Sequence, residues 1–101
     1  MTVFVNLKEN EPIRAEIVLE GLVQGVGFRY FALRNAQKFE LKGFVKNLYT
    51  GDLFVVVEGP KQLIHEYIEE MKVGPMHAHV KAHSIKWAEP TKEFSRFEIH
   101  K

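Results

Sequence analysis

The 101-residue sequence predicts an α+β domain in which two helices cover one face of an antiparallel sheet. Three observations support this prediction. Segments with alternating or with helical apolar spacing follow one another in the order strand, helix, strand, strand, helix, strand. Glycine or proline stands near most of the boundaries between these segments. Apolar residues make up 46% of a chain that has no internal repeat, which is enough for one core.

The first strand and the first helix differ in the period of their apolar residues. Ala15, Ile17 and Leu19 alternate with mostly charged neighbours over residues 14–20, as in a half-buried strand. After a glycine-containing segment the spacing becomes helical, at Phe28, Phe31, Ala32, Ala36 and Phe39. This stripe predicts a helix that begins at Phe28, ends near Phe39 or Glu40 and packs on the sheet.

A hairpin and a second helix are expected next. Residues 43–49 and 53–58 predict two strands, and Thr50-Gly51-Asp52 between them is short enough to require a hairpin. Gly59-Pro60 then begins a helix and Gly74-Pro75 ends it. The buried stripe expected for this helix is Leu63, Ile64, Tyr67, Ile68 and Met71.

Two further strands are expected near the end of the sequence. Residues 77–87 predict a strand with Val80 and Ala82 on one face. The alternation changes phase before Ile85, which indicates a bulge. Residues 94–99 predict a short last strand.

The order of the elements is that of the ferredoxin-like split βαβ sandwich, βαββαβ, which we expect for residues 14–101. Residues 1–13 would then form a tail or an extra edge strand. In this topology a helix returns the chain between the first and second strands, so both strands run in the same direction. The loop at residues 21–28 and Asn47, at the end of the second strand, should therefore be neighbours at one edge of the sheet.

The composition excludes several classes of protein. The chain has no cysteine, and therefore no disulfide, thiolate metal site or thiol nucleophile. Its formal net charge is +1 and its lysines are spread along the chain, which is a poor footprint for nucleic acid. No apolar run approaches the ~20 residues that cross a bilayer, and the first residues do not resemble a signal peptide. We expect a cytoplasmic protein with neither a nucleic-acid nor a membrane partner.

The glycine-rich segment from Gly21 to Arg29 is a candidate anion-binding loop, because it can turn successive backbone N–H groups inward at a helix N-terminus. Arg29 stands in the first helical turn, where the macrodipole disfavours a cation by ~0.3–1 kcal/mol. An anion bound in the loop would reverse that sign. An arginine in a surface salt bridge explains the same residues about as well, so both interpretations stay open.

Asn47 also has two interpretations. Asparagine is common where a strand enters a turn, and that alone explains it. Its expected position beside the loop suggests a second role, in which its side-chain carbonyl accepts a hydrogen bond from a water in line with a bound phosphorus atom. An amide does not take up a proton at neutral pH, so this role would be orientation of the water.

The segment Glu20-Gly21-x-Val23-Gln24-Gly25-Val26-x-Phe28-Arg29 is followed in order by Gly43-x-Val45-x-Asn47, Gly51, Gly74-Pro75 and Phe97-x-Ile99. Over residues 14–100 these motifs resemble the acylphosphatase family. The resemblance implies an enzyme that hydrolyses acyl phosphates, with inorganic phosphate as product and inhibitor. It further implies a monomer that needs no cofactor and no metal.

The resemblance assigns roles to individual residues. It implies that Arg29 and Asn47 are catalytic, with Arg29 binding the phosphate and Asn47 positioning the attacking water. The implied phosphate-binding residues are Val23, Gln24, Gly25, Val26, Gly27, Phe28 and Arg29.

Three residues depart from the family pattern. Glu40 stands where the family usually has the glycine that ends the first helix, so we expect a left-handed residue at a cost of ~1–2 kcal/mol. Leu48 stands where many members have a small hydroxyl residue. Thr50 stands where the hairpin more often has aspartate. The change at Leu48 is the one expected to alter the rate.

Other functions fit parts of the sequence. His77, His79 and His83 share strand parity and could line one face, but no acidic cluster completes a metal-ligand set. The same fold hosts ligand-binding and RNA-binding modules, although Phe54 and Trp87 do not make the outward aromatic pattern of an RNA-binding sheet. A third possibility is the acylphosphatase-like domain of a hydrogenase maturation carbamoyltransferase. There proline typically follows the arginine, whereas Tyr30 follows it here.

Overall fold

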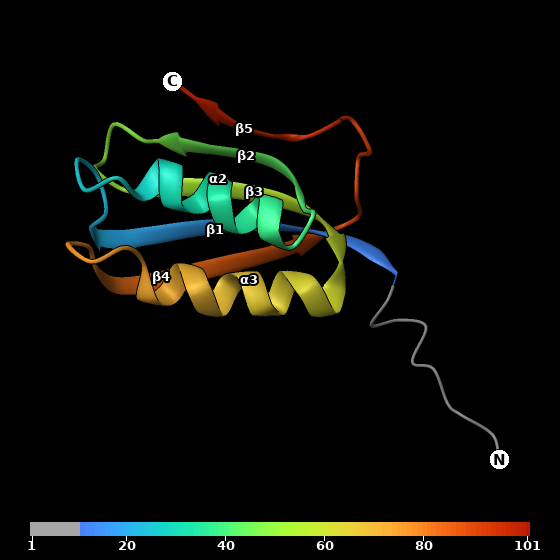
Figure 1. Ribbon diagram of the computed structural model, residues 1–101, viewed down its shortest axis with the longest axis horizontal. Helices are drawn as coiled ribbons and strands as arrows, with labels where there is room; N and C mark the ends of the chain where they lie inside the picture. The colour runs from blue at the N-terminus through green and yellow to red at the C-terminus, as the bar shows by residue number, and fades with distance from the viewer. Residues whose placement is uncertain (1–10) are drawn as a thin grey trace, which may run out of the picture.

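The computed structural model describes residues 11–101, which form a sheet with two helices on one of its faces (Figure 1). The elements are β1 (Pro12–Leu22), α2 (Phe28–Lys38), β2 (Lys42–Asn47), β3 (Leu53–Pro60), α3 (Lys61–Val73), β4 (His79–Ala88) and β5 (Phe97–His100). The expected type and order of these elements are confirmed. β1 begins earlier than expected, because Pro12 pairs with Pro60 of β3. Residues 1–13 were expected to form a tail or an extra edge strand, and residues 1–10 of this segment lie outside the described residues.

The strand order in the sheet is β4-β1-β3-β2-β5. β1 pairs antiparallel with β3 and β4, and β2 pairs antiparallel with β3, which is the ferredoxin-like arrangement. β5 instead pairs in parallel with β2, so the sheet is mixed rather than wholly antiparallel. The reason is the path of residues 89–96. They carry the chain to the end of the sheet where β2 begins, and β5 starts there with Phe97 opposite Gly43.

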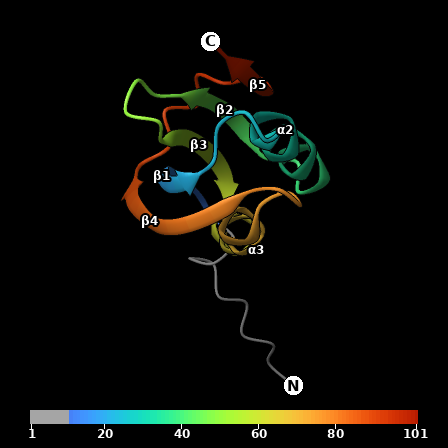
Figure 2. The ribbon, with the colours of Figure 1, turned by 90° about the vertical axis from the view of Figure 1, so that its left-hand side faces the viewer.

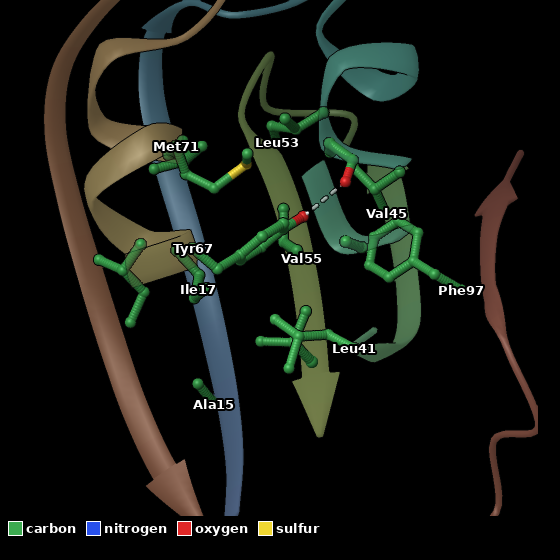
Figure 3. Close-up of a cluster of buried hydrophobic side chains, with 14 of the residues drawn as sticks. Ala15, Ile17, Leu41, Val45, Leu53, Val55, Tyr67, Met71 and Phe97 are labelled. Carbon is green, nitrogen blue, oxygen red and sulfur yellow. Dashed lines mark hydrogen bonds between the residues drawn. The ribbon is translucent and has the colours of Figure 1, made fainter. Parts of the chain in front are cut away.

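The core lies between the two helices and one face of the sheet (Figure 3). Ala15, Ile17 and Leu19 of β1 are fully buried in it, as their alternation predicted. Tyr67 of α3 is also fully buried, and its hydroxyl donates a hydrogen bond of 3.0 Å to the backbone carbonyl of Ala32 in α2. Burial raises the pKa of Tyr67 well above its ordinary value, so the hydroxyl stays a donor. This hydrogen bond links α3 to α2 and so helps to fix the position of the first turn of α2.

A buried carboxylate fixes the segment that leads to β5. Glu58 of β3 is only 7% exposed and accepts hydrogen bonds from the backbone N–H groups of Thr91 at 2.8 Å and Lys92 at 3.0 Å. It also accepts one from Nη1 of Arg14 at 3.0 Å. Burial raises the pKa of the Glu58 carboxyl, but these donors lower it by more, so its pKa lies below the ordinary value. The crossing segment is thereby held to the sheet.

The bulge in β4 lies earlier than the sequence predicted. Val80 pairs with Gly21 and Ala82 pairs with Glu20, so Lys81 is the extra residue. Val80 and Ala82 therefore do not share a face, contrary to the expectation. Gly21 explains the position, because it has φ 127° and a Cβ there would collide with the backbone of His79.

The end of α2 has the left-handed residue expected from the sequence. Glu40 has φ 56°, and the next N–H, of Leu41, returns to the carbonyl of Ala36 at 2.8 Å. A glycine would adopt this conformation without the steric cost of a Cβ. The chain then turns directly into β2.

The face of the sheet away from the helices carries an aromatic cluster. The ring of Phe44 in β2 lies 5.8 Å from that of Phe54 in β3, between centroids. Phe94 and His100 of the same chain pack against Phe44, and His100 stacks on it at 4.5 Å. An RNA-binding sheet stacks bases on such rings, whereas here the chain's own residues contact them.

Candidate active site

A cavity of about 260 Å³ opens where β1 and β2 end, at the end of the molecule that faces the viewer in Figure 2. Both strands are antiparallel to β3, so they run in the same direction and end at the same edge, as predicted. The cavity is lined by Val23, Gly25, Gly27, Phe28, Arg29, Tyr30, Asn47 and Ile99. The structure therefore brings Arg29 and Asn47 together with most of the expected loop.

The loop owes its shape to two glycines in left-handed conformations, Gly25 with φ 73° and Gly27 with φ 76°. A Cβ at either position would meet no atom within 4 Å, so the requirement is conformational and not one of space. Gly27 caps α2 without a side chain, and its carbonyl accepts the first helical hydrogen bond, from Phe31 at 3.1 Å. The N–H groups at the start of α2 precede that bond and are available to an anion.

Arg29 lies half-buried in the first turn of α2 and lines the cavity. Among residues 11–101, no carboxylate forms an ion pair with it. The surface salt bridge that offered the alternative explanation is thus not seen in the described part of the chain. A cation without a carboxylate partner at a helix N-terminus fits an anion site.

Asn47 is the last residue of β2 and pairs with Leu53 across the hairpin. Its Oδ1 atom is buried and accepts no hydrogen bond from the described residues. Buried polar atoms almost always have a partner, and an exception marks a binding or catalytic position or a water site. Because Asn47 also lines the cavity, this acceptor fits the water-binding role considered above.

Gln24 connects the loop to the β2–β3 hairpin. Its Nε2 donates hydrogen bonds to the backbone carbonyls of Leu48 at 2.8 Å and Asp52 at 2.9 Å. Neither Gln24 nor Val26 is among the residues that line the cavity, and Val26 packs against the core. These two residues can contribute their backbone N–H groups to the loop, but the side chain of Gln24 holds the loop beside the residue that follows Asn47.

The hairpin accommodates the departure at Thr50. Thr50 Oγ1 donates to Asp52 Oδ2 at 2.9 Å and accepts from the backbone N–H of Asp52 at 3.3 Å. The backbone N–H of Leu48 donates to the carbonyl of Asp52 at 2.9 Å. Thr50 therefore supplies the side-chain acceptor that aspartate or asparagine often gives in such turns.

Sequence reasoning missed two residues of the cavity, Tyr30 and Ile99. Tyr30 follows Arg29 in the first turn of α2 and is 59% exposed. Its position next to Arg29 was the feature of the sequence that could have identified it as a site residue. Ile99 reaches the cavity because β5 pairs with β2 so that Ile99 lies beside Val45. Nothing in the local sequence around Ile99 signals this pairing.

The three histidines considered as metal ligands do not share a face. His77 precedes β4, and the bulge at Lys81 lies between His79 and His83, so that these two point to opposite sides of the sheet. Residues 11–101 contain no group of three or more His, Cys, Asp or Glu side chains that could hold a metal ion. In the same part of the chain, neither α2 nor α3 has the length and apolarity to cross a membrane.

Comparison with known proteins shows the family to which the chain is related. A sequence model of the family described as acylphosphatase matches residues 15–99. The chain is 43% identical to an acylphosphatase of Moorella thermoacetica over 81 residues, which is 80% of this chain and 87% of that one. It is 34% identical to the crystal structure of acylphosphatase from Bacillus subtilis, with a TM-score of 0.85 over 88% of this chain and 99% of that chain.

A larger protein contains a similar domain. Full-length HypF, in its phosphate- and nucleotide-bound form, is 36% identical with a TM-score of 0.82, over 90% of this chain and 12% of that chain. The glycine loop at the start of α2, the sequence pattern over residues 15–99 and the shared fold lead to one conclusion: the chain belongs to the acylphosphatase family.

Proposed function

We propose that this enzyme hydrolyses the carboxyl-phosphate bond of acyl phosphates by in-line attack of a water held by Asn47 on a phosphate held by Arg29. One observation carries the proposal. Asn47, whose buried Oδ1 lacks a partner among the described residues, lines the same cavity as Arg29 and the glycine loop. An acceptor for water and a cation for phosphate thus face one small space.

The phosphate would be bound by Arg29 and by the backbone N–H groups of residues 23–28. The guanidinium offers a planar fork of donors that matches phosphoryl oxygens. The N–H groups at the start of α2 add donors and the positive end of the helix dipole. Phosphoryl transfer spreads negative charge over these oxygens in the transition state, so the same groups that bind the phosphate also lower the barrier.

The water would donate a hydrogen bond to Oδ1 of Asn47. Alignment of the attacking oxygen, the phosphorus and the departing oxygen is the main requirement of this reaction. A carboxylate is a weakly basic leaving group and departs without being protonated. Among residues 11–101, those that line the cavity include no Asp, Glu or His, which suits a reaction that needs no general acid. The phosphate group itself is then the acceptor of the water's proton.

The proposal also covers inhibition by the product, the oligomeric state and the location of the enzyme. Inorganic phosphate, the product, would occupy the loop and inhibit competitively. The enzyme would act as a cytoplasmic monomer, and the monomer is supported by the fact that residues of a single chain supply the arginine, the asparagine and the loop.

A steady-state assay with benzoyl phosphate in the presence of EDTA tests the proposal. Turnover should persist with EDTA, and Arg29→Ala should reduce kcat/KM by about 10²-fold or more, because it removes transition-state charge stabilisation. Arg96→Ala is the matched control, since Arg96 is exposed and pairs with Glu98. Inorganic phosphate should protect the wild type against heat but not Arg29→Ala. Equal protection of both proteins would show that Arg29 does not bind the anion.

A further inference from the structure

A second groove, of about 510 Å³, adjoins the catalytic cavity. It is lined by Gly27, Tyr30, Phe31, Arg34, Asn35, Lys38 and Pro75. Gly27 and Tyr30 line both spaces, whereas Asn47 lines the catalytic cavity but not this groove. The groove therefore joins the cavity at Gly27 and Tyr30 and not at Asn47, the residue proposed to hold the water.

The direction of attack makes this position informative. In an in-line displacement the leaving group departs on the side of the phosphorus opposite the attacking water. With the water at Asn47, the acyl group must extend away from Asn47. The groove that begins at Gly27 and Tyr30 is a space into which it can extend.

The described residues that line the groove give it positive charge. Arg34 and Lys38 line it, and no acidic residue in the described part of the chain does. Neither cation has a carboxylate partner within residues 11–101. The guanidinium of Arg34 lies 5.8 Å from the centroid of the Tyr30 ring, so its charge is beside a residue of the catalytic cavity. This is a local excess, since the whole chain has 14 basic and 13 acidic residues.

We propose that this groove is the subsite for the acyl group and that Arg34, assisted by Lys38, selects acyl groups that carry a second negative charge. The inference rests on the proposed function and adds its substrate class: acyl phosphates with a distal carboxylate or phosphate. Tyr30 and Phe31 contact the carbon chain, and Arg34 meets the distal anion.

The test compares two substrates of equal chain length, succinyl phosphate with a distal carboxylate and butyryl phosphate without one. An exposed ion pair changes an equilibrium by only a few-fold, so the wild type should show a kcat/KM for succinyl phosphate about two- to fivefold above that for butyryl phosphate at low salt. The preference should lie in KM, because the distal charge contributes equally to the ground state and the transition state. It should shrink at about 0.5 M salt.

Arg34→Gln should lower the succinyl-to-butyryl ratio toward one, and adding Lys38→Gln should complete the loss. Arg34→Glu should reverse the preference. Lys86→Gln is the control, because it removes one positive charge from β4, away from the groove, and should leave the ratio unchanged. A ratio that is near one in the wild type, or that survives in the double variant, overturns this inference while hydrolysis of butyryl phosphate upholds the proposed function. Absence of hydrolysis of both substrates overturns both.

Discussion

Gln24 should be needed for both stability and turnover, although its side chain does not line the cavity. Gln24→Ala removes the two hydrogen bonds that join the loop to the carbonyls of Leu48 and Asp52. Each bond contributes ~0.5–1.5 kcal/mol net. Both carbonyls keep a second donor, the N–H of Gly51 for Leu48 and the N–H of Leu48 for Asp52, so no carbonyl is left without a partner. The free energy of unfolding should therefore fall by about 2 kcal/mol.

Turnover should fall for a related reason. Without these bonds the loop that carries the phosphate is no longer fixed relative to the strand end that carries Asn47. A displacement of about 1 Å between reacting groups can cost about 10²-fold, so we expect kcat to fall by about 10- to 100-fold. Gln24→Glu should be worse than Gln24→Ala, because a carboxylate would face two carbonyl oxygens without a donor.

Urea denaturation and steady-state kinetics on the same preparations measure both effects. Gln37→Ala is the matched control, since Gln37 is exposed on α2, and it should change the unfolding free energy by less than about 0.5 kcal/mol. If Gln24→Ala matched that control in stability and kept wild-type kcat, the link between loop and hairpin would have no functional importance.

Three more predictions concern the catalytic amide, the end of α2 and the buried carboxylate. Asn47→Ala should reduce kcat by about 10²-fold while the inhibition constant of inorganic phosphate stays near the wild-type value. If phosphate binding weakened in proportion to the loss of kcat, Asn47 would be a structural residue. Glu40→Gly should raise the free energy of unfolding by about 0.5–1 kcal/mol, because the ~1–2 kcal/mol left-handed penalty exceeds the entropy that glycine adds to the unfolded chain; lower stability in urea would contradict this. Glu58→Gln should cost about 2–3 kcal/mol at pH 7. In the folded protein the pKa of Glu58 lies below its ordinary value of 4.5, so the difference in unfolding free energy between the wild type and Glu58→Gln should be fully present above pH 4.5. It should decrease as the pH falls through the pKa of the folded protein. A difference in unfolding free energy that does not change with pH would refute this explanation.

The sequence was sufficient wherever the determining interactions are local or follow from the order of elements. The left-handed residue at Glu40 and the turn at the glycines before Arg29 are properties of a few consecutive residues. The proximity of Arg29 and Asn47 needs only the fact that β1 and β2 run in the same direction.

What could not be predicted depends on contacts between distant segments. The bulge lies at Lys81 because Gly21 closely approaches the backbone of His79, and sequence spacing alone placed it nearer Ile85. Ile99 enters the cavity through the parallel pairing of β5, which follows from the path of residues 89–96. The contacts of Gln24 require knowledge of where the hairpin carbonyls lie.

The late position of β5 in the chain has a consequence for folding. Residues 23–30 and Asn47 can be synthesised and brought together while the last strand is still missing, but Ile99 cannot. Pairings between residues as distant in the chain as Gly43 and Phe97 form slowly, because the loop between them must close first. Recovery of enzymatic activity after dilution from denaturant should therefore lag behind recovery of helical circular dichroism, and the activity would serve as a reporter of the last step of folding.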